Sequence, residues 1–309
     1  MAREVIELLA VRPGGYYVDA TAGAGGHASL IAERLEGQGH LLALDQDPHA
    51  IAMAAEKLRV FPETRILRGN YRELGRWLDM VGWTGIDGLL IDAGVSSMQL
   101  DTPERGFSLQ AEGPLDMRMD PESGCSAREW LDSVSLEKLE QVLRDYGDVK
   151  PARRIARQIL DRRNRGALET TFDLAQAVRE ALPFVTSGTP DEIRQVFQAI
   201  RIAVNDELNA LEDCLETAVC RLNPGGRIVA IAFHSGEDRI IKQVFRKYTR
   251  TAVERDPDGR TRRVRPAVLR ELLRTPLRPA SDEITRNPRS TSARIRAAEK
   301  RSSEKEDPA

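Results

Sequence analysis

The sequence of 309 residues has few of the residues that build disulfide frameworks, metal centres and membrane spans. Its three cysteines, Cys125, Cys214 and Cys220, form no Cys-x-x-Cys pair, which indicates a reduced intracellular protein without structural zinc. The four histidines are scattered and show no metal-ligand spacing. No apolar run reaches the roughly 18 residues that a membrane helix needs, and the first ten residues lack the profile of a signal peptide. We therefore expect a cytoplasmic protein that uses neither a metal nor a membrane.

Overall positive charge is also missing, because the formal net charge is −2. The 41% of hydrophobic residues is ample for a core, and the length favours two domains. Any contact with nucleic acid must therefore come from local basic stretches. Two are present, at 152–165 and at 239–278, and the second holds 13 Lys and Arg against 4 Asp and Glu. Such stretches bind phosphates in a salt-dependent way, although a solvated helix face is the commoner meaning of an arginine-rich helix.

Short apolar runs alternate with helical patterns along the first hundred residues. This alternation, at about 25-residue spacing, predicts an α/β fold with a doubly wound parallel sheet and right-handed crossovers. The pattern returns with a long helix at about 190–222, a strong apolar run, a further helix and a basic loop at 250–265. The strands are expected at 16–20, 40–45, 65–70, 86–94 and 227–235.

Between about 101 and 200 the apolar strand pattern stops, and several amphipathic helical patterns take its place. We interpret this stretch as an inserted helical domain. The predicted organisation is a first part of the sheet domain at 1–100, the insertion at 101–200, a second part at 201–296 and a disordered tail at 297–309.

The segment DATAGAGGH (19–27) is typical of a nucleotide-binding turn between a strand and a helix. Glycines remove the Cβ atoms that would keep a ligand from the main chain, and the following helix start presents free N–H groups. Asp45 ends the next strand, where a carboxylate can accept hydrogen bonds from both ribose hydroxyls. The turn lacks the GxGxxG dinucleotide fingerprint and begins with Asp19, which suits a ligand with a cationic end, such as S-adenosylmethionine.

Two further strands end in candidate site residues. Tyr71 follows the third strand and can lie against an adenine, although a core tyrosine is an equal alternative. Asp92 and Gln99 follow the fourth strand, at the sheet edge where open α/β folds bind ligands. N-capping by Ser96 or Ser97 is the alternative explanation of that polar run.

Seven segments together resemble one family: DATAGAGGH, LALDQDP, DGLLIDAGVSSMQLD, RGFS with GPLDMRMD, VFQAIRIAVNDEL, PGGRIVAIAFHSGEDR and NPRSTSARIRAAEK. They are similar, in order and over nearly the whole chain, to the bacterial ribosomal RNA small-subunit methyltransferase H family. The resemblance implies S-adenosylmethionine-dependent methylation of N4 of a cytidine in the decoding region of 16S ribosomal RNA. It also implies a class I methyltransferase sheet (Rossmann-like) interrupted by a helical domain that recognises the RNA of the small ribosomal subunit.

The resemblance further implies which residues contact the cofactor: Gly25, Gly26, His27, Asp45, Tyr71, Asp92 and Gln99. The sequence departs from the family at a few positions. A His-x-x-Val-Leu segment ahead of the first helix is missing, Ala93 stands where the family often has leucine, and Gly236 follows the Phe-His-Ser segment where leucine is usual. The two substitutions spare the implied cofactor contacts, whereas the missing segment corresponds to part of the pocket wall.

Methylation of an exocyclic cytosine amine requires the nitrogen to be held in line with the sulfonium methyl and its hydrogens to meet acceptors. The Asp/Asn-Pro-Pro-Tyr/Phe motif that does this in many amino-methyltransferases is absent. Our hypothesis is that Asp92, the carbonyls of 93–94 and His234 face the base, with His234 as a proton acceptor. The equal alternative is that His234 orients a loop through hydrogen bonds.

Other functions stay open at this point. A non-catalytic, cofactor-binding ribosome-assembly factor or a methyltransferase for another substrate has the same glycine turn. An NAD-dependent oxidoreductase needs the longer glycine fingerprint, which is absent. The sequence leaves the oligomeric state undetermined.

Overall fold

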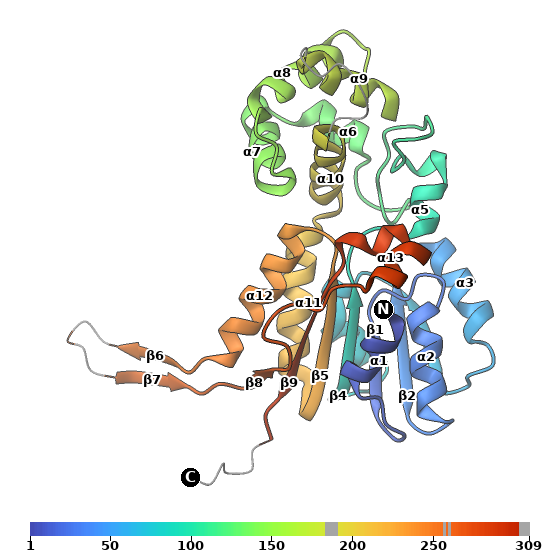
Figure 1. The fold of residues 1–309 in the computed structure, drawn as a ribbon, viewed down its shortest axis with the longest axis vertical. Coiled ribbons are helices and arrows are strands. Elements are labelled where there is room, and N and C mark those ends of the chain that lie inside the picture. Colours follow the sequence, from blue (N-terminus) through green and yellow to red (C-terminus); the bar gives the residue numbers. More distant parts are fainter. Residues whose placement is uncertain (183–190, 256–257, 259–260, 303–309) are drawn as a thin grey trace. The chain divides into compact units, whose positions relative to one another are not determined.

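A computed structural model of the chain describes residues 1–182, 191–255, 258 and 261–302. The chain forms two compact units (Figure 1): the first comprises Met1–Gly94 and Leu208–Ala309, and the second Val95–Glu207. None of the helices in these described ranges is both long and apolar enough to cross a bilayer.

The first unit is built on a seven-stranded sheet with the order β3-β2-β1-β4-β5-β9-β8. The first five strands of this order pair in parallel, whereas β9 is antiparallel to β5 and to β8. From β1 the chain adds β2 and β3 on one side, and it then returns to add β4 and β5 on the other side of β1. The boundary between β1 and β4 is therefore the topological switch point, where doubly wound folds bind ligands. The predicted class I, Rossmann-like fold is therefore confirmed. The strands are β1 (Tyr16–Asp19), β2 (His40–Asp45), β3 (Thr64–Arg68), β4 (Ile86–Asp92), β5 (Leu222–Ala232), β8 (Leu269–Glu271) and β9 (Arg294–Lys300).

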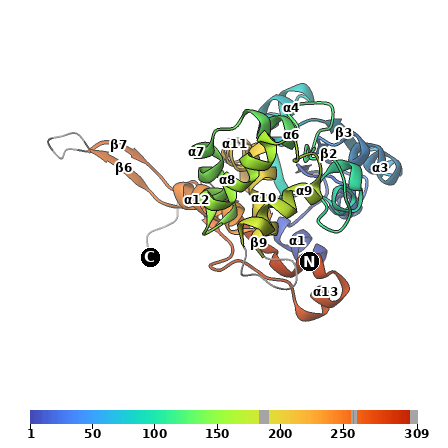
Figure 2. The same cartoon turned by 90° about the horizontal axis from the view of Figure 1, so that it is seen from above.

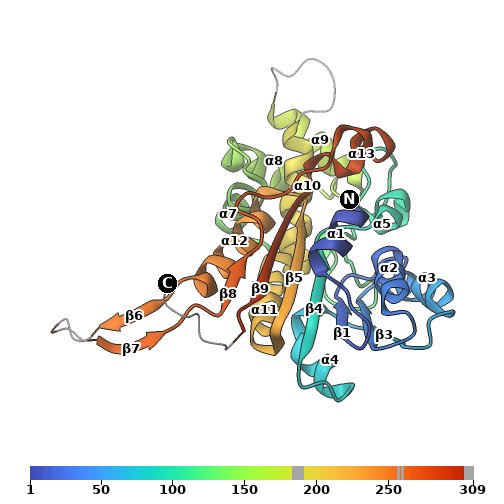
Figure 3. The same ribbon diagram turned by 60° about the horizontal axis from the view of Figure 1, so that its bottom comes forward.

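Helices cover both faces of this sheet (Figure 3), which explains why its strands read as continuous apolar runs. Within β2, Leu41 and Ala43 pack into one core, whereas Leu42 and Leu44 pack into the other. Successive side chains of a strand point to opposite faces, so each face needs its own helices. One face is covered by α1 (Ala2–Leu9), α2 (Gly26–Leu35) and α3 (Pro48–Leu58), the other by α4 (Leu74–Met80), α11 (Glu207–Arg221) and α12 (Ser235–Thr249).

The single helix predicted at about 190–222 is two helices, α10 (Asp191–Asn205) and α11. Asp206 separates them with a left-handed backbone, φ 49°. Aspartate tolerates this conformation better than most residues, and an ion pair between Arg201 and Glu207, 2.7 Å apart, spans the break. The amphipathic pattern continues across Asp206 and therefore hides the interruption.

Two predictions for the C-terminal part are wrong. The basic loop predicted at 250–265 contains the antiparallel pair β6 (Ala252–Arg255) and β7 (Thr261–Arg265). The tail predicted from 297 starts too early, because β9 continues to Lys300 and pairs with both β5 and β8, burying Ala297 and Ala298. Residues 303–309 of that predicted tail lie outside the described residues. The short helices α13 (Ser281–Arg286) and η3 (Pro288–Ser292) precede β9.

The regular secondary structure in the described residues of the second unit is helical, apart from a single bridge between Pro114 and Thr170, and residues 106–126 form a long irregular connection. Serine or threonine side chains cap the N-termini of four of its helices, at Ser96, Ser126, Ser135 and Thr170. In Figure 2, α10 lies among its neighbours, and it packs against α6, α7 and α9 around one apolar core. The other helices are α5 (Ser97–Asp101), η2 (Pro103–Arg105), α6 (Ala127–Ser133), α7 (Leu136–Gly147), α8 (Ala152–Asn164) and α9 (Thr171–Ala181).

Because the sheet is packed on both faces, a cavity in the central strand β4 should lower the stability of the protein strongly. Leu89 is fully buried, so Leu89→Ala should lower the free energy of unfolding by about 2–5 kcal/mol. Met80 on α4 is 57% exposed, and Met80→Ala should change it by less than about 0.5 kcal/mol. Urea unfolding followed by circular dichroism measures both; equal effects would contradict the packing described here.

Candidate functional site

The turn between β1 and α2 leaves its main chain open on one side. Gly23 and Gly25 have φ of 51° and 77°, the left-handed region that favours glycine. A Cβ added to Gly23 or Gly26 would meet no atom within 4 Å, whereas one on Gly25 would lie 3.4 Å from the Cα of Ala54. Gly25 therefore fits the turn against α3, and Gly26 begins α2 beside open space. A ligand can approach the N–H groups of this helix start without meeting a side chain.

Asp45 fixes the turn from the neighbouring strand. Its Oδ2 accepts the N–H of Gly23 at 2.8 Å, and its Oδ1 accepts the N–H of Asp47 at 2.9 Å. Burial raises the pKa of Asp45, and these amide donors oppose that rise. Each carboxylate oxygen has further acceptor capacity, as binding of ribose hydroxyls requires.

Asp19, at the end of β1, is fully buried. Its Oδ1 accepts the N–H of Thr21 at 3.2 Å, but its Oδ2 meets no hydrogen-bond donor among the residues that the structure describes. Burial, reinforced by the nearby charge of Asp45, raises the pKa of Asp19 to about 7. A buried carboxylate with an empty acceptor position is stabilised by a proton or by a cationic ligand.

Asp92 ends β4 and is tied to the same turn, since its N–H donates to Oγ1 of Thr21 at 2.7 Å. Its Oδ2 lies 3.7 Å from Nδ1 of His27, while its Oδ1 is buried without a donor in the described part of the chain. Burial, with the charges of Asp19 and Glu237, raises the pKa of Asp92 to about 7. Burial also lowers the pKa of His27, so the imidazole is neutral at pH 7 and does not balance the Asp92 charge.

The two unsatisfied carboxylate oxygens belong to paired strands, because β1 and β4 lie side by side with Asp19 opposite Leu90. Next to them are the open helix start at Gly26 and the Asp45 carboxylate at the end of β2. An organic cation with a ribose, such as the S-adenosylmethionine implied by the resemblance, fits this set of donors and acceptors. The fit rests on acceptors that need positive charge and on space that a Cβ would fill.

His234 follows β5 and caps α12. Its Nδ1 accepts the N–H of Gly236 at 3.1 Å and that of Glu237 at 3.4 Å, so Nδ1 carries no proton. Its Nε2 lies 3.1 Å from Oε1 of Glu237 but makes no hydrogen bond with any residue that the structure describes, and Oε2 of Glu237 accepts the N–H of Phe233 at 2.7 Å. Both ring nitrogens of His234 therefore face the first turn of α12. This geometry favours the loop-orienting alternative for His234.

The remaining predicted cofactor residues lie in different parts of the molecule. Tyr71 begins η1 (Tyr71–Glu73) after β3 and is half-buried against one core of the first unit. Gln99 belongs to the second unit, where its Oε1 accepts the N–H of Ser96 at 3.0 Å and Ser96 Oγ accepts the N–H of Gln99. The predicted N-capping by Ser96 is thus confirmed.

Two residues of the site, Glu237 and Thr21, were not predicted from the sequence. Glu237 is almost fully buried and joins the end of β5 to α12, and its position three residues after His234 was the available signal, a capping-box spacing. Thr21 connects Asp19 to Asp92, and nothing in the sequence marks it.

The chain is similar over nearly its whole length to known proteins. A model of the MraW methylase family matches residues 1–301. Ribosomal RNA small subunit methyltransferase H of Methylococcus capsulatus is 48% identical over 303 residues, covering 97% of this chain and 99% of the relative. The protein of the same name from Thioalkalivibrio sulfidiphilus is 45% identical over 303 residues, covering 97% and 96%. Among solved structures, an rRNA methylase from Streptococcus thermophilus matches with a TM-score of 0.39 and 12% identity, covering 97% and 94%.

The buried carboxylate predicts a stability that falls with rising pH. The folded-state pKa of Asp19, about 7, exceeds its ordinary 3.8, so the folded chain binds the extra proton between these values and loses stability as pH rises through them. Asp19→Asn keeps an acceptor for Thr21 without the charge. Its free energy of unfolding should exceed that of the wild type by roughly 4 kcal/mol at pH 8 and by roughly 1.5 kcal/mol at pH 5.

Urea unfolding at the two pH values measures this difference. Asp79→Asn is the control, because Asp79 is 63% exposed and pairs with Arg221 at the surface. A gain for Asp19→Asn that is the same at pH 5 and pH 8 would show that the carboxylate does not titrate in this range.

Proposed function

The chain belongs to the MraW methylase family, and we propose that it transfers the methyl group of S-adenosylmethionine to N4 of a cytidine in the decoding region of 16S ribosomal RNA. The observation that carries the proposal is the pair of unsatisfied carboxylates beside an open glycine turn at the switch point of the sheet. The full-length similarity to proteins named ribosomal RNA small subunit methyltransferase H supports the substrate. The choice of N4 of a cytidine rests on the resemblance of the sequence motifs to the ribosomal RNA small-subunit methyltransferase H family.

Several residues of the first unit would hold the cofactor. Asp45 accepts the ribose hydroxyls with the acceptor capacity left by its two amide contacts. Gly25 and Gly26 let the methionyl part approach the start of α2, and Asp19 receives its ammonium group. Tyr71 offers a ring for the adenine. When bound, the cofactor supplies an electrophilic methyl group on a sulfonium.

Asp92 is proposed to act on the cytidine amine. The amine nitrogen is a poor nucleophile, because its lone pair is delocalised into the ring, and attack becomes easier as an acceptor engages its hydrogens. The unsatisfied Oδ1 of Asp92 is such an acceptor. With a pKa of about 7, Asp92 is ionised above neutral pH and can take the proton that the nitrogen loses after methyl transfer.

His234 is proposed to position Asp92 and its surroundings rather than to take the proton. Its Nδ1 is used by two amides of α12, and its Nε2 faces Glu237. Glu237 in turn contributes to the raised pKa of Asp92. A change at His234 therefore reaches the reacting base through Glu237 and the β5–α12 connection.

The proposed activity is tested with small ribosomal subunits from cells that lack this protein. The purified chain and S-adenosylmethionine with a tritiated methyl group should label the 16S RNA, and nucleoside mass analysis should find N4-methylcytidine. Label on a different nucleoside would refute the proposed specificity. Cofactor binding without any transfer would favour the assembly-factor alternative.

A matched pair of variants separates the roles of Asp92 and His234. Asp92→Asn removes the ionisable acceptor and should lower kcat at pH 8 by about 10²-fold or more, and it should flatten the rise of kcat/KM for S-adenosylmethionine between pH 6 and pH 8, because that ratio reports the free enzyme. His234→Asn keeps a strong N-cap for α12 and should lower kcat by less than about 10-fold. If His234→Asn lost as much activity as Asp92→Asn at unchanged melting temperature, His234 would be the proton acceptor instead.

A further inference from the structure

Helix α8 of the second unit, with the residue that follows it, carries six arginines, at positions 153, 154, 157, 162, 163 and 165. Its apolar stripe, which includes Ile155 and Ile159, is buried in the core of the unit. The arginines therefore lie on the flanks and on the outward face of the helix, and the structure divides them into two groups by their contacts.

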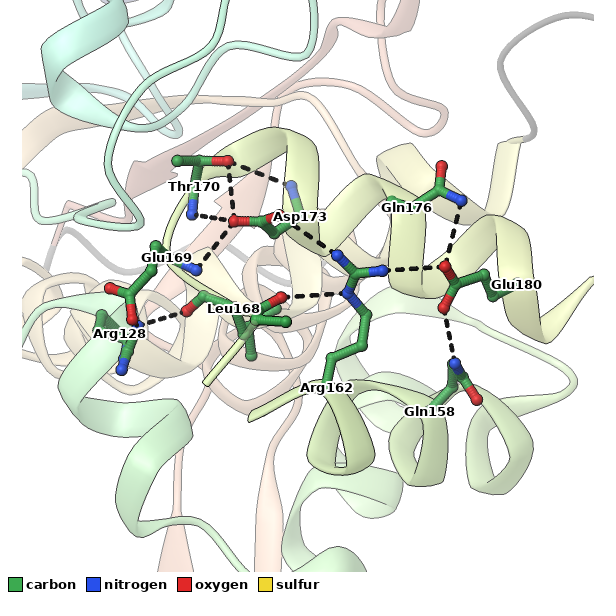
Figure 4. A network of polar contacts seen from close by, with 10 residues as sticks. Arg128, Gln158, Arg162, Leu168, Glu169, Thr170, Asp173, Gln176 and Glu180 are labelled. Atoms are coloured by element: carbon green, nitrogen blue, oxygen red, sulfur yellow. Dashed lines mark hydrogen bonds and ion pairs between the residues drawn. The ribbon is translucent and has the colours of Figure 1, made fainter. Parts of the chain in front are cut away.

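Three of these arginines are used within the protein. Arg162 lies between two carboxylates (Figure 4), 3.3 Å from Asp173 and 2.9 Å from Glu180, and it also donates to the carbonyl of Ala167. Arg163 donates from Nη1 to main-chain carbonyls at the end of α6, including that of Leu131 at 3.0 Å.

Arg153 completes this first group with an ion pair to Glu140 on α7, 3.4 Å away. Glu180 is held further by Gln158 and Gln176, which donate to its two oxygens (Figure 4). The carboxylates that α7 and α9 present to α8, those of Glu140, Asp173 and Glu180, thus form ion pairs with Arg153 and Arg162.

The other three, Arg154, Arg157 and Arg165, are exposed, and their side chains make no hydrogen bond or ion pair with any other residue that the structure describes. At 100° per residue they fall on one face, opposite the buried stripe. Lys150, just before the helix, is exposed and equally unpaired within the described ranges. Asp161 is the acidic residue on this face, so three arginines stand against one carboxylate.

We propose that this outward face of α8, formed by Lys150, Arg154, Arg157 and Arg165, binds the sugar-phosphate backbone of the substrate RNA. The proposal rests on the proposed function and names the surface that holds the RNA. Guanidinium groups match phosphate oxygens in geometry and charge, and a helix keeps them in a fixed row. From Arg154 to Arg165 this row is about 16 Å long, at 1.5 Å per residue.

The apolar residues of α8 argue against a membrane as the partner. A helix that lies on a bilayer presents large apolar side chains beside its basic ones. Here the apolar stripe of α8 is enclosed in the core. The exposed large apolar residue found in the described part of this unit is Phe172, which belongs to α9.

The test compares the full-length triple variant Arg154→Gln/Arg157→Gln/Arg165→Gln with the wild type. Binding is measured at several salt concentrations, with small subunits from cells lacking this protein as the probe. Three lost phosphate contacts should reduce the slope of log K against log salt by about 2 and weaken binding roughly 10-fold near physiological salt. In the methylation assay, KM for the subunit should rise at nearly unchanged kcat.

A control variant removes the same charge elsewhere. Arg3, Arg59 and Arg76 have side chains that are 87%, 75% and 62% exposed in the first unit, and each pairs with a glutamate three or four residues away. Their triple replacement by glutamine should leave the salt slope within about 0.5 of the wild type. Circular dichroism and melting temperature confirm that both triple variants fold.

An α8 variant that binds the subunit with the affinity and salt slope of the control would overturn the proposal. So would unchanged subunit binding combined with a loss of binding to phosphatidylserine vesicles, which would identify a membrane surface. If the wild type binds subunits through this face but transfers no methyl group, the RNA surface stands and the proposed methyl transfer fails, so the two conclusions are separable.

Discussion

Two carboxylates at the carboxyl ends of adjacent parallel strands, Asp19 fully buried and Asp92 partly buried, impose the electrostatic constraint on which the rest of the site depends. Asp19 and Asp92 each keep one oxygen out of water and without a donor from the residues described in the structure. Leaving such an oxygen unsatisfied is costly, so each group holds a proton near neutral pH or requires positive charge beside it. Under the proposed function, the sulfonium and ammonium groups of the cofactor would supply this positive charge.

Rigid support is needed to keep two such groups close together. Thr21 bonds to both, through its N–H to Asp19 and its hydroxyl to the N–H of Asp92. Behind them the sheet is packed on both faces, with alternate residues of each strand entering different cores. Close packing on both sides keeps the strand ends, and with them the two carboxylates, in fixed positions.

The parts of this design that repeat along the chain were predictable from the sequence. The strand–helix alternation, the glycine turn and the position of Asp45 follow from hydrophobic period and spacing, and the structure places all three as expected. Features set by one residue's backbone or by contacts distant in sequence were not. Asp206 interrupts an amphipathic pattern that looks continuous, and β9 runs past its expected end, where its charged Glu299 pairs with Arg227 on β5 and Arg270 on β8. The contacts of His234 depend on how α12 begins.

The raised pKa values of Asp19 and Asp92 also bear on how a site rich in carboxylates can accept a negatively charged RNA. Permanently ionised carboxylates would repel the phosphates that flank a target nucleotide. Because the pKa of Asp19 and of Asp92 is about 7, the site without cofactor carries only part of its formal negative charge at neutral pH. With a bound sulfonium and ammonium, the remaining charge is balanced as the carboxylates ionise. Under the proposed function, this reduced charge weakens the repulsion between the site and the RNA, and surface arginines such as those of α8 supply the attraction.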